Sequence, residues 1–213
     1  MAFKLIKPSP HRIESYSGKI LNYALEHPFY GWSEDEVIDC ARAAVSQSAV
    51  NLEIFTLAAA ELQKRHGETH KGIQQIRKDF QVKTISWLSG LRHRVRSLKK
   101  EYNFSAKYPR THKVYAILLT ESSTDLSIKG VYIGQTSKTI ENRFDVHKNP
   151  LSSHAAGVAR RRGHQLLYSV SALLPGITKA DSKEFEHLLI SSLKGEGSRQ
   201  PLRHLPVSWV RGR

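Results

Sequence analysis

Apolar residues between positions 33 and 105 recur at the three- and four-residue intervals of amphipathic helices. Ser33 followed by Glu36 forms a capping-box pattern, in which two side chains satisfy the free N–H groups of a helix start. The same apolar stripe returns several times before the pattern ends. The first predicted helix begins at Ser33, and a second runs through Leu52 and stops near Gly67. Two more helices are predicted over Ile73–Phe80 and from Thr84 to Leu98. The region therefore predicts an all-helical N-terminal domain, residues 1–105.

The apolar period falls to two after a polar break at residues 102–112. The alternating run Val114–Leu118 and the apolar run Gly130–Gly134 predict two strands joined by a long polar loop. The remaining predicted elements are a helix over Thr139–His147, a third strand over Leu166–Leu174 and a helix over Asp181–Leu193. Residues 106–213 therefore form a second domain, a small sheet with flanking helices, and the whole chain is of the α+β class.

The chain is strongly basic, with 33 Lys and Arg against 19 Asp and Glu and a net charge of +14. The surplus is spread over both predicted domains and is not confined to one tail. A polyanion is the partner that such a charge favours, and nucleic acid is the commonest polyanion. The composition therefore predicts a nucleic-acid-binding protein.

The single cysteine, Cys40, excludes an intrachain disulfide and a cysteine-based zinc cluster. No apolar run approaches the roughly 20 residues that a membrane-spanning helix needs. The first residues hold too short an apolar stretch for a signal peptide. A cytoplasmic protein without a membrane partner is therefore expected.

Four residues that suit phosphodiester chemistry lie within about thirty positions of one another. Tyr115 and Tyr132 are placed on the two predicted strands, and Tyr132 belongs to the string Val-Tyr-Ile-Gly-Gln-Thr-Ser. Arg143 and His147 follow on the next predicted helix, four residues apart and hence on one helix face. Two phenols, a guanidinium and an imidazole can supply acid–base chemistry and charge stabilisation at a phosphate.

The order and spacing of these residues resemble the catalytic module of the GIY-YIG endonuclease family. Tyr132-Ile133-Gly134 reproduces the second motif, and Lys113-Val114-Tyr115 stands where the family has Gly-Ile-Tyr. The resemblance covers about residues 112–195 and implies a small GIY-YIG-type sheet. It also implies one divalent metal ion, Mg²⁺ or Mn²⁺, held by a glutamate on a later helix. Glu186, which precedes His-Leu-Leu-Ile, matches that position better than Glu184.

The resemblance also implies a role for each residue. Tyr115 acts as the general base on water, with His147 as a relay, and Tyr132 hydrogen-bonds the water or the phosphate. Arg143 binds the scissile phosphate, and Glu186 holds the metal ion.

Clusters of basic residues elsewhere are candidates for contact with the nucleic-acid backbone, which Lys and Arg bind through its phosphates. One cluster lies on the predicted helix that ends near residue 98, one follows the Arg143 helix, and one is near the end of the chain. These candidates are Arg92, Arg96, Lys99, Lys100, Arg160, Arg161, Arg162, Arg199 and Arg203.

The predicted function is therefore a metal-dependent DNA endonuclease, most like a stand-alone restriction or defence member of the family. One alternative is a nucleic-acid-binding module that has lost cleavage. Another is a toxin or mobile-element nuclease that acts on a different nucleic acid. The sequence leaves open a homodimer and a protein partner bound through the helical domain.

Overall fold

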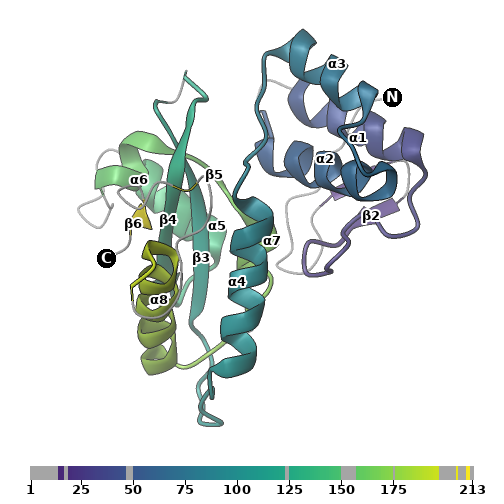
Figure 1. Cartoon of the computed structure of the whole chain (residues 1–213). Coiled ribbons are helices and arrows are strands. Elements are labelled where there is room, and N and C mark those ends of the chain that lie inside the picture. Colours follow the sequence, from purple (N-terminus) through teal and green to yellow (C-terminus); the bar gives the residue numbers. More distant parts are fainter. Residues whose placement is uncertain are drawn as a thin grey trace. The chain divides into compact units, whose positions relative to one another are not determined.

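The structure is a computed structural model that describes residues 14–16, 19–46, 50–122, 125–149, 157–174, 176–196, 205 and 210–211. The chain is a mixed α and β protein (Figure 1), as its apolar periods predict. It divides into two compact units, Met1–Leu88 and Ser89–Arg213, called here the N-terminal and the C-terminal unit. The predicted domain boundary lay after residue 105. The structure instead groups α4 (Leu88–Glu101), from its second residue on, with the sheet.

The described residues of the N-terminal unit form three helices, α1 (Glu34–Ser46), α2 (Leu52–His66) and α3 (Lys71–Phe80). The capping box is confirmed: the Glu36 N–H donates to Ser33 Oγ at 3.2 Å, and the Ser33 N–H donates to Glu36 Oε2 at 2.7 Å. Two short antiparallel strands, β1 (Glu14–Tyr16) and β2 (Lys19–Leu21), precede the helices. The unit therefore differs from the all-helical domain that was expected.

The C-terminal unit is built on a mixed sheet with the strand order β5-β3-β4-β6. Its two long strands, β3 (Lys113–Thr120) and β4 (Ile128–Thr136), form the predicted antiparallel hairpin. The other two strands are short: β5 (Gly163–Leu166) pairs antiparallel with β3, and β6 (Val210–Arg211) pairs parallel with β4. Both long strands are buried along most of their length, because helices pack on the sheet.

The predicted third strand over Leu166–Leu174 is wrong. The strand β5 ends at Leu166, and the following residues form the short helix α7 (Tyr168–Ser171). Ser171 Oγ donates to the Leu167 carbonyl at 2.9 Å and accepts the Ala116 N–H at 3.2 Å. The Ser171 hydroxyl therefore accepts the β3 backbone N–H that a longer β5 strand would have paired with a carbonyl.

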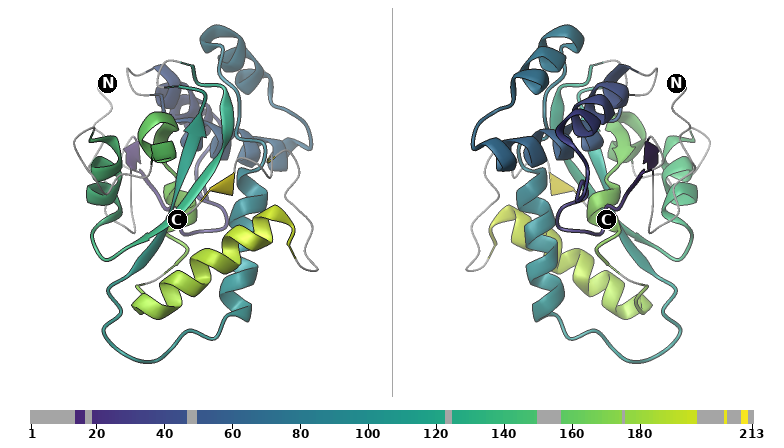
Figure 2. Two further views of the ribbon diagram at one scale, coloured as in Figure 1. Left: turned by 90° about the vertical axis from the view of Figure 1, so that its left-hand side faces the viewer. Right: turned by 90° about the vertical axis from the view of Figure 1, so that its right-hand side faces the viewer.

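Three further helices complete the C-terminal unit: α5 (Ile140–Lys148), α6 (Gly157–Arg162) and α8 (Lys179–Lys194). Figure 2 shows α8 and α4 on one side of the β3–β4 hairpin and α5 on the other. Apolar residues of β3 and β4 pack with Ile140 of α5 and Ala159 of α6 in one core cluster. The hairpin is thus the central layer, and side chains on its two faces meet different helices.

Candidate active site

Tyr115 and Tyr132 lie on the same face of the hairpin. In the β3–β4 register Tyr115 is opposite Gly134, and Ile117 is opposite Tyr132. Residues opposite each other in an antiparallel pair project to one face, so both phenol rings stand on the side covered by α5. Their ring centroids are 6.3 Å apart, and each residue is 1% exposed.

Gly134 makes room for the Tyr115 ring. A Cβ atom at Gly134 would lie 2.6 Å from the Tyr115 hydroxyl oxygen, 2.7 Å from its Cζ and 2.9 Å from Tyr132 Cε1. Real Cβ atoms do not approach other heavy atoms this closely, so any other residue would displace one of the rings. The glycine of the Tyr-Ile-Gly string is therefore a steric requirement of the tyrosine pair, a role that its sequence position alone did not reveal.

His147 completes the aromatic group from α5. The Tyr115 hydroxyl and His147 Nε2 share a hydrogen bond of 2.7 Å, and both groups are buried. The His147 ring also packs edge-on against Tyr132, with ring centroids 5.3 Å apart. Three residues that the sequence placed on two strands and one helix thus form a single contact group, defined here as the Tyr115–Tyr132–His147 cluster.

Arg143 lies one helical turn before His147 on the same face of α5. The helix begins after Thr139, whose side chain accepts the Asn142 N–H, and its buried residues are Ile140, Arg143 and His147. Arg143 is 7% exposed and His147 is 0% exposed. The predicted pairing of a guanidinium and an imidazole on one buried helix face is therefore present.

Glu186 comes from α8, on the other side of β4. It is 6% exposed, whereas Glu184 is exposed. With Gln135, Lys183, His187 and Ile190, Glu186 lines a pocket of about 280 Å³. Gln135 directly follows Gly134, so its side chain points to the opposite face of β4 from Tyr115. The pocket therefore lies on the α8 side of the strand whose other side carries the phenols.

Glu184 has a different environment. The Tyr102 hydroxyl donates to Glu184 Oε2 at 2.8 Å, and both residues line a second pocket of about 490 Å³ with Asp181. Burial raises the pKa of Tyr102 above its ordinary value, and the hydrogen bond to Glu184 raises it further. The two glutamates, two residues apart, thus face different surroundings, as helix geometry requires.

The donor set around Glu186 fits a hard divalent cation. Mg²⁺ takes oxygen ligands and keeps several of its waters, so one carboxylate with a nearby amide oxygen is a suitable protein share. Gln135 Oε1 supplies that amide oxygen, and it accepts the Ser182 hydroxyl at 3.5 Å. A pocket of about 280 Å³ holds an ion together with several waters, each of which takes about 30 Å³ in the liquid.

Lys183 and His187 were not singled out from the sequence, although both line the Glu186 pocket. They lie four residues apart on α8, and Glu186 lies between them. Lys183 lies three residues before Glu186 and His187 one residue after it, which could have indicated a shared site. The same spacing occurs on any helix face exposed to solvent, so it did not distinguish these residues. The pocket thus combines one carboxylate with a lysine amino group and an imidazole.

Several basic residues of α4 are buried or hydrogen-bonded within the protein, which the sequence did not predict. Arg92 is only 5% exposed, although the sequence predicted a phosphate contact for it. The reason is its position: residue 92 lies four after Leu88 and three before Val95, on the stripe that faces the core. Lys99 donates to the Leu173 carbonyl at 2.9 Å, Arg96 is half-buried, and Lys100 is exposed.

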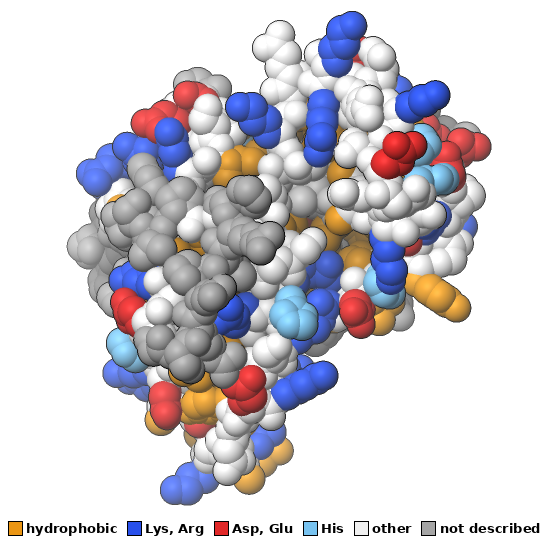
Figure 3. Space-filling view, in the orientation of Figure 1, with side chains coloured by type: hydrophobic (Ala, Val, Ile, Leu, Met, Phe, Trp, Pro, Cys, Tyr) orange, Lys and Arg blue, Asp and Glu red, His pale blue; other side chains and the backbone are white. Residues whose placement is uncertain are grey.

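The other predicted phosphate contacts lie on α6 or outside the described residues. Arg160 and Arg161 are exposed at the end of α6. Arg162 Nη1 pairs with Glu121 Oε1 at 3.3 Å, and the same carboxylate bonds Lys129. Arg199 and Arg203 fall outside the described residues. On the face drawn in Figure 3, the Lys and Arg side chains of the described part are dispersed and do not gather in one patch.

The chain matches no protein-family model, no curated protein and no solved structure. Among the helices of the described residues, none has the length and apolar character to cross a membrane.

Proposed function

We propose that the chain is a metal-dependent endonuclease of the GIY-YIG type that hydrolyses DNA phosphodiester bonds. The observation that carries the proposal is the hydrogen bond of 2.7 Å between the Tyr115 hydroxyl and His147 Nε2. His147 packs against Tyr132 and lies on the same helix as Arg143. A phenol has an ordinary pKa near 10 and needs a proton acceptor to work as a base near neutral pH. An imidazole in direct contact is such an acceptor.

The first step is activation of water. The Tyr115 hydroxyl passes its proton to Nε2 of His147, and the resulting phenolate takes a proton from the attacking water. Tyr132 packs against the His147 ring and fixes its orientation. The hydroxide then attacks phosphorus, the bond to the leaving oxygen breaks, the leaving alkoxide takes a proton from water, and His147 releases its extra proton to solvent.

Arg143 and the Glu186 pocket stabilise the charges that this attack creates. The guanidinium of Arg143 binds the nonbridging oxygens, because a planar fork of donors matches phosphate geometry. Glu186 would hold Mg²⁺ or Mn²⁺ on the α8 side of β4, opposite the Tyr115 face, and such an ion would supply positive charge only to a phosphate bound at the end of the strand, where the two faces meet.

The substrate and assembly follow from the charge and the chemistry. A net charge of +14 suits a polyanionic duplex, with the exposed Arg160, Arg161 and Lys100 in contact with phosphates. Cleavage of both strands of a duplex favours two active sites, which a homodimer provides. A restriction or defence role fits a chain in which the unit with the proposed active site is joined to the N-terminal unit.

A second candidate is a nucleic-acid-binding module without cleavage. The observation that favours it is burial: Tyr115 is 1% exposed and His147 is 0% exposed. Catalysis requires water to reach the Tyr115 hydroxyl. If the cluster serves only as packed core, by contrast, Tyr115 and His147 need no access to solvent. Cleavage therefore requires the side chains over the cluster to move when DNA binds.

Cleavage assays separate the two candidates. Supercoiled and linear duplex DNA, a junction, single strands and RNA are incubated with the protein in Mg²⁺ or Mn²⁺, beside the variants Tyr115→Phe and Glu186→Gln. Metal-dependent cleavage that both variants lose supports the endonuclease, and the preferred substrate identifies its target. Intact substrates with tight, salt-sensitive binding in all three proteins identify the binding module.

A further inference from the structure

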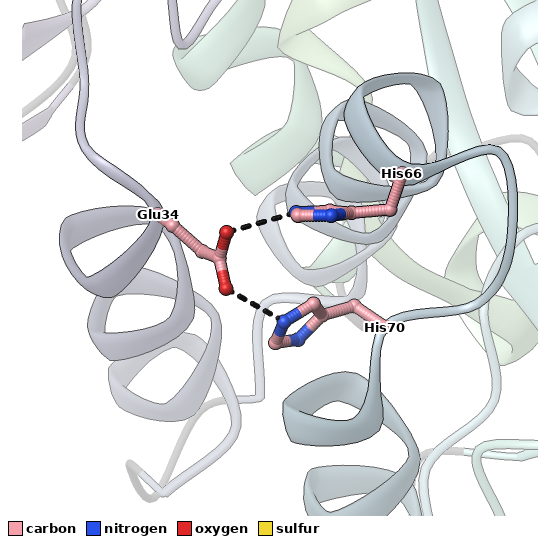
Figure 4. A group of neighbouring side chains, drawn as sticks. All are labelled: Glu34, His66 and His70. Carbon is pink, nitrogen blue, oxygen red and sulfur yellow. Dashed lines mark hydrogen bonds and ion pairs between the residues drawn. The ribbon is translucent and has the colours of Figure 1, made fainter.

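Glu34, His66 and His70 converge on one point in the N-terminal unit (Figure 4), and the proposed hydrolysis uses none of them. His66 Nε2 lies 2.8 Å from Glu34 Oε2, and His70 Nε2 lies 2.8 Å from Glu34 Oε1. One ligand atom from each of the three residues can be chosen so that all lie within 4.8 Å of one another. This is the spacing of donors that share one ion.

Three helix ends bring these side chains together. Glu34 is in the first turn of α1, and His66 is the last residue of α2. Gly67 ends α2 with φ = 77°, in the left-handed region that glycine adopts without strain. The chain then reaches His70, which caps α3 and lies with its ring centroid 5.1 Å from that of His66.

The nearby cation Lys19 pairs with Glu36, whereas the carboxylate of Glu34 contacts the two histidines. Glu36, also in the first turn of α1, is held by the Ser33 N–H at 2.7 Å and by Lys19 Nζ at 2.6 Å. Glu34 instead directs one carboxylate oxygen at each imidazole. Two imidazole nitrogens and a carboxylate are the ligand set of many three-ligand zinc sites.

We propose that Glu34, His66 and His70 bind one divalent transition-metal ion, with Zn²⁺ as the preferred ion. Imidazole ligands select such ions over Mg²⁺ and Ca²⁺. The side chains of Glu34, His66 and His70 are 43%, 38% and 19% exposed, so water can complete a tetrahedral coordination. The ion ties the start of α1, the end of α2 and the start of α3 together, and its binding stabilises the N-terminal unit.

Binding of the ion is coupled to the cap of α3. The Gly72 N–H donates to His70 Nδ1 at 3.1 Å, so a neutral His70 ring carries its proton on Nε2 and donates it to Glu34. A metal ion takes the Nε2 lone pair, which moves the proton to Nδ1. The Gly72 N–H then loses its acceptor. The site therefore exchanges one helix-capping hydrogen bond for a metal bond.

This coupling provides a variant that separates ligation from folding. Asparagine is among the best helix-capping residues, so His70→Asn keeps an acceptor for the first turn of α3 while removing the imidazole ligand. Glu34→Gln keeps a hydrogen-bond acceptor for one of the two histidines and removes the carboxylate charge. Retained helical circular dichroism shows that each variant folds.

The test is a titration of the metal-free full chain with Co²⁺ and then Zn²⁺. We expect one Co²⁺ per chain to show the visible absorption of a tetrahedral site, whatever Co²⁺ binds at Glu186, with displacement by Zn²⁺ and a higher unfolding temperature in Zn²⁺. His70→Asn and Glu34→Gln should each lower the affinity at least about tenfold, since even residues outside the ligand set cost that much. Absence of binding by the folded wild type, or wild-type affinity in both variants, overturns the site.

Two control variants locate the ion. His93→Gln, at an exposed position of α4, should keep the wild-type affinity. Glu186→Gln should also keep it, because the proposed nuclease site is separate from this one. If Glu186→Gln abolishes Co²⁺ binding and His70→Asn does not, the ion belongs to the Glu186 pocket and the Glu34–His66–His70 site is overturned.

Discussion

The Tyr115 hydroxyl lies 2.7 Å from Nε2 of His147, although the two residues are 32 positions apart and belong to β3 and α5. The contact depends on β4, because Gly134 leaves space for the Tyr115 ring and Tyr132 packs against the His147 ring. A phenol and an imidazole held in this way can pass a proton between them. This relationship is the physical core of the proposed catalytic function.

Removing either partner should abolish most cleavage. We expect Tyr115→Phe and His147→Gln each to lower kcat/KM by about 10²- to 10⁴-fold, the usual contribution of general acid–base catalysis. Because the two residues act as one unit, the double variant should be no slower than the slower single variant. DNA binding should stay within a few-fold of wild type. Losses that multiply in the double variant would contradict the shared proton path.

Several elements of the fold and of the candidate active site could be predicted from local sequence signals. Alternation over Val114–Leu118 identified β3, and the capping box at Ser33 marked the start of α1. The four-residue step from Arg143 to His147 placed both side chains on one helix face. These signals depend on period and spacing, which the backbone geometry fixes locally.

The missed features depend on contacts between distant segments. The Leu166–Leu174 run looked extended, but Ser171 bonds to β3 from a helical turn. Arg92 looked like a surface cation, yet tertiary packing buried it. Glu34 and His66 lie far apart in the sequence, and only the packing of α1 against α2 brings them together.

A methyl group at Gly134 should disturb the cluster. With its Cβ 2.6 Å from the Tyr115 hydroxyl oxygen, Gly134→Ala should cost about 1–3 kcal/mol of stability by overpacking. In a Tyr115→Phe background the added cost of Gly134→Ala should persist, because Cζ would still be 2.7 Å away, whereas in a Tyr115→Ala background the added cost should be smaller and set by the 2.9 Å contact with Tyr132 Cε1. Denaturant unfolding measures each difference. Gly157→Ala is the control, since its Cβ would meet only Arg161 Nη2 at 4.0 Å.

The two glutamates of α8 should separate cleavage from packing. Glu186→Gln should remove metal-dependent cleavage, because an amide does not replace a carboxylate as a ligand for a hard cation. Glu184→Gln should leave cleavage intact, since Glu184 is exposed and bonded to Tyr102. The readout is the initial cleavage rate against Mg²⁺ concentration. Equal loss in both variants would assign the effect to damage of α8.

Stability at alkaline pH should depend on Tyr102. Burial and the hydrogen bond to Glu184 raise the pKa of Tyr102 above its ordinary value, so the folded state keeps a proton that the unfolded state loses near pH 10. The stabilisation is therefore fully present below about pH 10 and is lost as the pH rises further. Tyr102→Phe should cost about 0.5–1.5 kcal/mol at neutral pH. Its deficit against wild type should shrink above about pH 10 in urea unfolding curves. Tyr108→Phe, whose ring is 83% exposed, is the control.

Arg92 and Arg161 should differ in what they contribute, although both were predicted to contact phosphates. Arg161 is exposed on α6, so Arg161→Ala should weaken binding uniformly across DNA sequences and reduce the salt slope by about 1. Arg92 is 5% exposed, so Arg92→Ala should lower stability by about 1–3 kcal/mol, the usual cost of disrupting a buried polar group. Its salt slope should stay unchanged. Binding titrations at several salt concentrations, combined with urea unfolding, measure both quantities. A lower salt slope for Arg92→Ala with unaltered stability would show that Arg92 reaches the DNA after all.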